Sequence, residues 1–169
     1  MDFSELIRQR FSVLDYLHQP VSPELVRSIL DAGLAAPTAC NFQPQRILVI
    51  DDDVSRAKLS RVVPSRVYVP LAFLVCYDSR ECWVRPMDGK SSGEIDAAIV
   101  TTHMMLQATA LGLGSIWVMS WDPAQIKQEF SLDGHLEPTA LLVVGHKSPD
   151  ATPHKGHFIS KTPEEVVIS

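Results

Sequence analysis

The stretch EIDAAIVTTHMMLQATALGLGSIWVM, residues 94–119, decides how the rest of the chain is interpreted. Residues 94–111 carry apolar or small side chains on nearly every side of a helix, which is typical of a helix that is buried all round. In a chain of 169 residues this pattern predicts that a second subunit covers one face of the helix. Ser91 and Glu94 have the spacing of a capping box and predict its start. Gly112 to Gly114 end it, and Ser115 to Met119 begin a strand.

The other elements follow from local signals on either side of this stretch. Ser22 is a predicted N-cap, Pro23 takes the first helical position, and Pro37 stops that helix. Apolar runs predict strands at 46–50, 71–77 and 139–144. Short helices are predicted at 3–9 and 54–62, and Asp122-Pro123 predicts the start of another that runs to about Phe130. The C-terminal tail is expected to form a short element. Interleaved helices and strands predict a single domain over residues 1–169, either α/β or α+β, with a sheet covered by helices.

Composition excludes several classes of protein. A formal charge of -5 argues against a nucleic-acid partner, which requires a basic face. The chain lacks the run of ~18 to 20 apolar residues that a membrane span needs. Its first residues are acidic rather than the basic start of a signal peptide. The three cysteines, at positions 40, 76 and 82, form no Cys-x-x-Cys pair and predict free thiols in a reducing compartment. We therefore expect a cytoplasmic protein.

The loop from Ala36 to Pro44 is the first candidate for a binding site. It joins a predicted helix to a predicted strand, and such loops often carry function. Thr38, Asn41 and Gln43 offer neutral hydrogen-bonding groups that do not titrate near pH 7. These groups suit a planar, uncharged ligand with polar edges. The alternative interpretation is a tight turn with caps.

Other motifs give little sign of a catalytic residue or a metal. No nucleophile motif is present. His154 and His157 lack further ligands nearby, and Asp51 to Asp53 are interpreted as a capping turn. For His103, a core histidine held by hydrogen bonds is favoured over a catalytic base. A polar cluster of Arg8, Arg10 and Ser12 could, together with Lys155 and Lys161, hold a phosphate.

Five motifs in this order resemble the FMN-dependent nitroreductase family, in a small single-domain branch, over nearly the whole chain. They are Arg10 to Leu14, Ala36 to Pro44, Trp83 to Lys90, the helix and strand from Asp96 to Val118, and Lys161 to Val167. The resemblance implies an α+β fold in which helices flank a mixed sheet. It also implies an intertwined homodimer with FMN at the interface.

The resemblance further implies roles for individual residues. Arg10, Ser12 and Lys161 match positions that reach the FMN phosphate and ribityl chain. The loop residues Pro37, Thr38, Ala39 and Asn41 match those that approach the flavin from the other subunit. Trp117, Val118, Met119 and Ser120 match the segment along the isoalloxazine, where a backbone N–H faces flavin N5. A flavin carries its own redox chemistry, which agrees with the lack of a predicted acid, base or nucleophile.

The resemblance implies an oxidoreductase that passes hydride from NAD(P)H through FMN to a nitroaromatic, a quinone or another small electrophile. The chain departs from the family pattern at Phe11, Leu14 and Ser160, where basic residues are usual, and at Met87, where Tyr is common. Each missing cation removes a charge-assisted bond to the phosphate. Two alternatives therefore stay open: a flavin-binding member with little or no reductase activity, and a member that uses flavin for another reaction.

Overall fold

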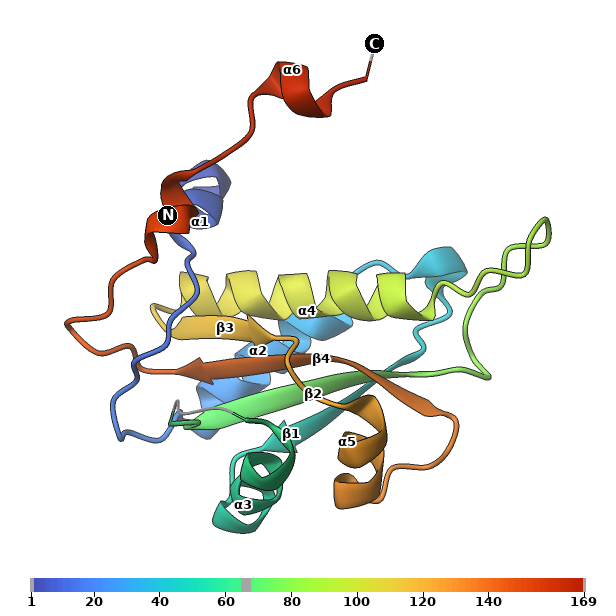
Figure 1. Cartoon of the computed structure of the whole chain (residues 1–169), viewed down its shortest axis with the longest axis horizontal. Coiled ribbons are helices and arrows are strands. Elements are labelled where there is room, and N and C mark those ends of the chain that lie inside the picture. Colours follow the sequence, from blue (N-terminus) through green and yellow to red (C-terminus); the bar gives the residue numbers. More distant parts are fainter. Residues whose placement is uncertain (1, 65–67, 169) are drawn as a thin grey trace.

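A four-stranded sheet forms the centre of the computed structural model, which describes residues 2–64 and 68–168 (Figure 1). The strands are β1 (Gln45–Ile50), β2 (Leu71–Asp78), β3 (Gly114–Val118) and β4 (Leu136–Gly145), in the order β1-β2-β4-β3. All three pairs of neighbouring strands are antiparallel. A parallel bridge between Ser12 and Ser115 adds the N-terminal segment to the outer edge of β3. The α+β class is therefore confirmed.

Helices cover both faces of this sheet. The helices α2 (Pro23–Leu34) and α4 (Gly93–Ala110) lie on one face, and α3 (Asp53–Val62) and α5 (Pro123–Phe130) lie on the other (Figure 1). The alternation of side chains along the strands gives each face its own core. Phe73 and Leu142 pack with α2 and α4, whereas Leu74 and Leu141 pack with α3 and α5. The central strands β2 and β4 are buried on both sides, which explains their nearly continuous apolar sequences.

The predicted start of α4 was wrong in its chemistry, although its position was correct to one residue. The N-cap is Ser92, and it makes no side-chain cap bond. Its hydroxyl instead donates to the Asp96 carboxylate at 2.7 Å, while Ser91 Oγ accepts from the Gly93 N–H. The capping-box pattern of Ser91 and Glu94 therefore does not form. A buried acceptor one turn inside the helix competes for the serine that would otherwise cap it.

The prediction that α4 is buried on all sides does not hold within one chain. Val100, Met104 and Ala108 are buried against α2 and the sheet, but the opposite stripe lies at the surface. Ile95 is 53% exposed, and His103 is half-buried beside a shallow hollow along the same stripe. His103 is therefore not the fully buried core histidine that the sequence favoured. That a second subunit covers this stripe stays a prediction.

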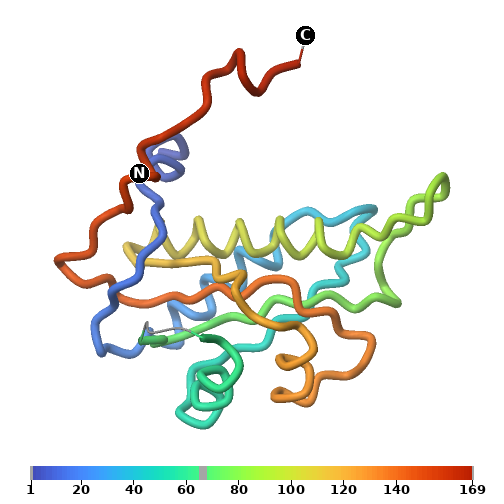
Figure 2. The backbone as a smooth tube through the Cα atoms, viewed as in Figure 1, coloured from blue at the N-terminus to red at the C-terminus, as the bar shows by residue number. Residues whose placement is uncertain are grey.

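The N-terminal helix and the start of the C-terminal segment lie close together at one side of the molecule. The helix α1 (Phe3–Gln9) lies near the short helix η2 (Lys155–Phe158), and the segment beyond it extends away from the domain (Figure 2). That segment contains α6 (Pro163–Val166), which confirms the short terminal element. Within the described residues, no helix has both the length and the hydropathy needed to cross a membrane.

Candidate functional site

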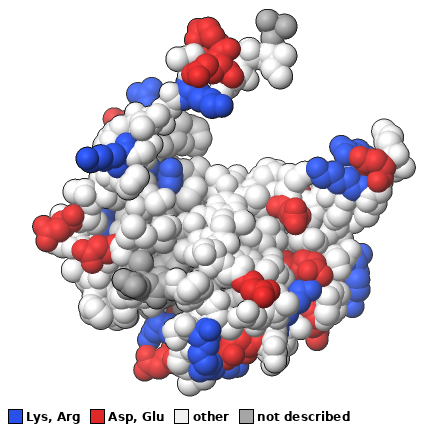
Figure 3. Space-filling model, viewed as in Figure 1, with Lys and Arg blue, Asp and Glu red and all other residues white. Residues whose placement is uncertain are grey.

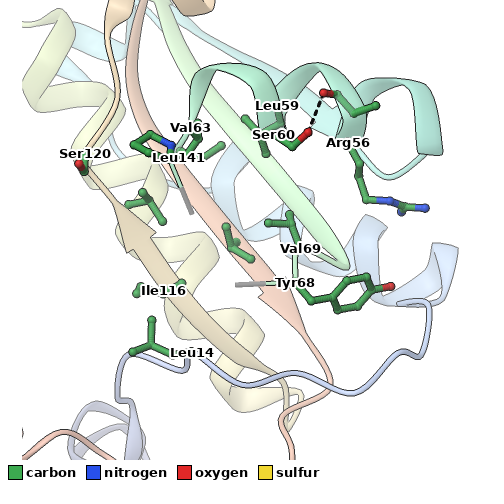
Figure 4. Close-up of a pocket in the computed structure, with 14 residues that line it drawn as sticks. Leu14, Arg56, Leu59, Ser60, Val63, Tyr68, Val69, Ile116, Ser120 and Leu141 are labelled. Atoms are coloured by element: carbon green, nitrogen blue, oxygen red, sulfur yellow. Dashed lines mark hydrogen bonds between the residues drawn. The ribbon is translucent and has the colours of Figure 1, made fainter. Parts of the chain in front are cut away.

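A mostly apolar cavity lies between the edge strand β3, its neighbour β4 and the helix α3 (Figure 4). Its volume is about 470 Å³, within the range of roughly 300 to 1,000 Å³ that is usual for ligand sites. Leu14 and Ser120 lie at opposite ends of it, with Ile116 beside Leu14 (Figure 4). Further lining side chains come from both strands and from α3: Val118, Leu141, Val143, Leu59 and Val63. The cavity therefore has the shape and polarity to hold a flat, largely apolar ring system.

Arg56 is the one charged residue among the described residues that line this cavity, and its guanidinium is already engaged. It donates to the backbone oxygens of Asp51 and Pro70, and to the Asp53 carboxylate at 2.6 Å. The side chain reaches away from the apolar walls in Figure 4. An anionic group on a ligand would therefore find no free cation inside the cavity and would have to lie at its open end.

The N-terminal segment reaches the cavity at the end marked by Leu14. The Val13 N–H donates to the Ser115 carbonyl at 2.9 Å, and the Leu17 N–H donates to the His146 carbonyl at 2.8 Å. These bonds hold Arg10 and Ser12 beside the first residues of β3. Ser12 is exposed and Arg10 is half-buried at the end of α1, two and four residues before Leu14, so both lie on the segment that leads to this end of the cavity.

The segment Trp117–Ser120 is divided between the two faces of the sheet. Val118 and Ser120 line the cavity. Trp117 packs instead with the core on the α4 side, and its indole Nε1 donates to Met119 Sδ at 3.0 Å. Met119 is 66% exposed just beyond the strand. The predicted lining segment therefore contributes two side chains to the cavity, and the other two lie outside it.

The loop from Pro37 to Gln43 is folded into an unusual conformation. Three of its residues, Cys40, Asn41 and Gln43, have φ between 51° and 56°, which is uncommon for residues other than glycine. Two bonds hold the loop in this shape. The Gln43 N–H donates to Thr38 Oγ1 at 3.0 Å, and the Ala39 N–H donates to the Asp96 carboxylate at 2.9 Å. The loop is therefore preformed before any ligand arrives.

One chain does not bring the predicted site residues together. The loop is fixed to Asp96 in the first turn of α4, whereas Arg10 and Ser12 lie beside the strand that follows the last turn. With 18 residues, α4 separates these two groups by roughly 27 Å. Lys161 lies in the C-terminal segment that extends away from the domain (Figure 2). The residues therefore form two half-sites at opposite ends of one helix.

Two parts of this arrangement were not predicted from the sequence. Leu59 and Val63 form a wall of the cavity, and their spacing of four residues was an available signal in a helix expected to lie at the surface. Asp96 anchors the loop, and the available signal was a carboxylate among the apolar residues Ile95, Ala97 and Ala98 of the helix. Burial raises the pKa of the Cys76 and Cys82 thiols. These two thiols are therefore protonated at neutral pH and are poor nucleophiles. Within residues 2–64 and 68–168, no group of three potential metal ligands occurs.

Comparison with known proteins relates this architecture to one family. The family profile described as "Nitroreductase family" matches residues 7–68 and 71–146. The fold is similar to the crystal structure of a nitroreductase family protein from Clostridium difficile 630. That protein is 41% identical, with a TM-score of 0.93 over 99% of this chain and 98% of the other.

Two further relatives carry information on ligands in their names. A protein from Desulfovibrio desulfuricans, assigned as a nitroreductase and solved in complex with FMN, is 28% identical. Its TM-score is 0.80 over 98% of this chain and 95% of the other. A protein from Methanothermobacter thermautotrophicus, assigned as an NADH dehydrogenase or NAD(P)H nitroreductase, is 29% identical over 158 residues. The match spans 86% of this chain and 78% of the relative.

Proposed function

Because the chain belongs to the nitroreductase family, we propose that it reduces small electrophilic acceptors with electrons from NAD(P)H through a flavin at a subunit interface. Its class is that of an NAD(P)H-dependent oxidoreductase, and its cofactor is FMN. The acceptor is a nitroaromatic, a quinone or a similar molecule. With a quinone, NAD(P)H and one proton yield NAD(P)⁺ and the hydroquinone, so two electrons and two protons reach the acceptor.

The observation that carries this proposal is the separation of the half-sites along α4. A two-fold dimer in which two copies of α4 cross in opposite directions would place the Thr38 to Asn41 loop of one chain beside the partner's cavity. The exposed stripe of Ile95, Ala98 and Ile99 supplies an apolar surface for that contact. Much of the face shown in Figure 3 carries uncharged side chains, with a few acidic groups among them and the other charged ones nearer its edges. The exposed apolar stripe of α4 supports the homodimer.

The residues of the cavity fit the flavin ring. Its apolar walls match the flat ring system, and the open end beside Arg10 and Ser12 suits the ribityl chain and phosphate. Lys161 is proposed to reach the same phosphate from the C-terminal segment. Pro37, Thr38, Ala39 and Asn41 of the partner chain are proposed to close the site. When bound, the flavin supplies the hydride chemistry, so the protein needs to bind, orient and exclude water.

The backbone of β3 supports the placement of a hydrogen-bond donor at the ring. β3 is an edge strand, and Ser115 turns its carbonyl outward to accept from Val13. Backbone groups alternate in direction with a period of two residues. Trp117, and then Met119 just past the strand, therefore turn their N–H groups outward as well. A donor of this kind stabilises a reduced flavin nitrogen without a side chain that titrates.

A second candidate function is flavin binding with little or no reduction of acceptors. It is favoured by the apolar side chain of Leu14 at the cavity end, where relatives usually carry a cation. A flavin used for another reaction would share the same cavity. We place the protein in the cytoplasm, as expected for a chain whose three cysteines are free.

The test begins with the purified protein in solution. We expect sedimentation at twice the chain mass and a flavin absorbance near ~450 nm after incubation with FMN. Anaerobic NADH or NADPH should bleach that absorbance, and a quinone should restore it. Parallel lines in steady-state plots would support one site used in turn by donor and acceptor. A stable monomer would contradict the shared interface, whereas a flavin that NAD(P)H does not bleach would favour the non-reductase alternative.

A further inference from the structure

A second hollow of about 270 Å³ lies directly beside the Ala39 loop. It is bounded by the first turns of α4 and by residues 83–91, whose ends pair through a bridge between Val84 and Ser91. Figure 1 shows this hairpin projecting beyond the N-terminal end of α4. In the proposed dimer, the Ala39 loop approaches the partner's flavin. The hollow therefore opens beside the place where an acceptor must lie.

The base of the hollow suits an aromatic ring. The Trp83 side chain is half-buried there, and Ile95 and Ile99, at the border of the stripe proposed to meet the partner, supply aliphatic surface from successive turns of α4. An indole offers a flat, polarisable surface for an offset-stacked ring. The polar atoms nearby are largely satisfied, because the Asp96 carboxylate accepts from the Ala39 N–H and from the Ser92 hydroxyl. The lining thus favours a planar molecule over a flexible polar one.

The rim of the hollow carries one uncompensated positive charge. The Arg85 guanidinium is engaged by Asp88 in a two-pronged ion pair, with Nε–Oδ1 at 2.7 Å and Nη2–Oδ2 at 2.5 Å. The Lys90 ammonium has no acidic partner within the part of the chain that the structure describes. Its backbone is nevertheless fixed, since the Arg85 N–H donates to the Lys90 carbonyl at 2.9 Å and Asp88 accepts from the Lys90 N–H. The Arg85–Asp88 pair therefore helps to fix the backbone from which the Lys90 side chain reaches the hollow that Trp83 also lines.

We infer that this hollow selects planar aromatic acceptors that carry an acidic group, and that Lys90 is the specificity-determining residue. The inference rests on the proposed function, because the hollow is part of the acceptor site only if the loop reaches the partner's flavin. An acceptor seated there lays its ring against Trp83 and its carboxylate toward Lys90. The ion pair between this carboxylate and Lys90 is open to water, so the preference for acidic acceptors is moderate rather than absolute.

The test compares 4-nitrobenzoate with 4-nitrobenzamide, which have nearly the same shape and differ in charge. We expect the wild-type dimer to have the higher kcat/KM for the benzoate. Lys90→Gln should lower the ratio of the two values about three- to tenfold through KM, and Lys90→Glu should reverse the preference. Added salt should shrink the wild-type ratio. Lys58→Gln, on α3 at the other face of the sheet, is the matched control and should leave the ratio unchanged.

Three outcomes overturn the inference in distinguishable ways. Reduction of both acceptors with the same ratio in wild type and Lys90→Gln would refute the role of Lys90 and leave the proposed function intact. A change confined to the KM of NADPH relative to NADH would assign the hollow to the donor's phosphate instead. Failure of the flavin-loaded wild type to reduce either acceptor would refute the proposed function, and the inference with it.

Discussion

Replacing Asp96 by alanine tests whether α4 holds the loop from Pro37 to Gln43. The Asp96 side chain is 2% exposed and accepts two hydrogen bonds, from the Ala39 N–H at 2.9 Å and the Ser92 hydroxyl at 2.7 Å. A hydrogen bond to a charged group contributes about 1.5 to 3 kcal/mol. The Ala39 N–H lies near the surface, where water can replace part of that contribution. We therefore expect Asp96→Ala to lower the free energy of unfolding by about 2 to 4 kcal/mol.

Urea unfolding at pH 7 measures this change, and a melting curve should fall by roughly 2 to 4 °C for each kcal/mol. Asp96→Asn keeps the size of the side chain and one acceptor oxygen. Its loss of unfolding free energy should therefore be about half of that for Asp96→Ala. Glu94→Ala lies in the same turn on the exposed side and should stay within ~0.5 kcal/mol of wild type. An Asp96→Ala protein as stable as Glu94→Ala would refute the anchoring of the loop.

Three further perturbations test other parts of the structure. Gly93→Ala places a Cβ against the ring of Tyr77 and 2.8 Å from Cys82 Sγ. The urea midpoint should therefore fall by an amount equivalent to about 1 to 3 kcal/mol. An unchanged midpoint would mean that the Tyr77 ring moves aside without cost. The Arg80 guanidinium holds the pKa of the buried Asp78 carboxylate well below its usual range. That contribution to stability is present above the unfolded pKa of about 3.9 and is lost as pH falls toward the folded value, so Asp78→Asn should flatten the acid-unfolding curve below pH ~4. Arg10→Ala should weaken FMN binding on the order of ten- to a hundredfold and leave riboflavin unaffected in titration calorimetry. Equal weakening of FMN binding and riboflavin binding would show that Arg10 does not contact the phosphate.

Elements with strong local signals could be predicted from the sequence. Ser22 caps α2 and Asp122 caps α5 with Pro at the next position, as expected, because these bonds join residues within one turn. The start of α4 could not be predicted in the same way. Its serine is drawn to Asp96, and that preference depends on a carboxylate that also holds a loop 57 residues earlier in the chain.

Motifs indicated candidate residues for a site, but their arrangement in space could not be predicted from the sequence. Val118 and Ser120 face the cavity while Trp117 faces the other core, because a strand alternates and its face depends on the register with β4. The left-handed backbone at Cys40, Asn41 and Gln43 gave no signal, since no glycine marks it. That the two half-sites lie at opposite ends of α4 depends on the sheet order, which local patterns do not encode.

The placement of the half-sites at opposite ends of α4 has a genetic consequence. In the proposed dimer, each site takes its Arg10 side from one chain and its Thr38 to Asn41 loop from the other. Two inactive variants, one damaged at Arg10 and one damaged in the loop, would form a mixed dimer in which both lesions fall in one site. The other site would then be built entirely from intact parts. Co-expression of the two defective alleles should therefore complement, with about a quarter of all sites restored under random pairing.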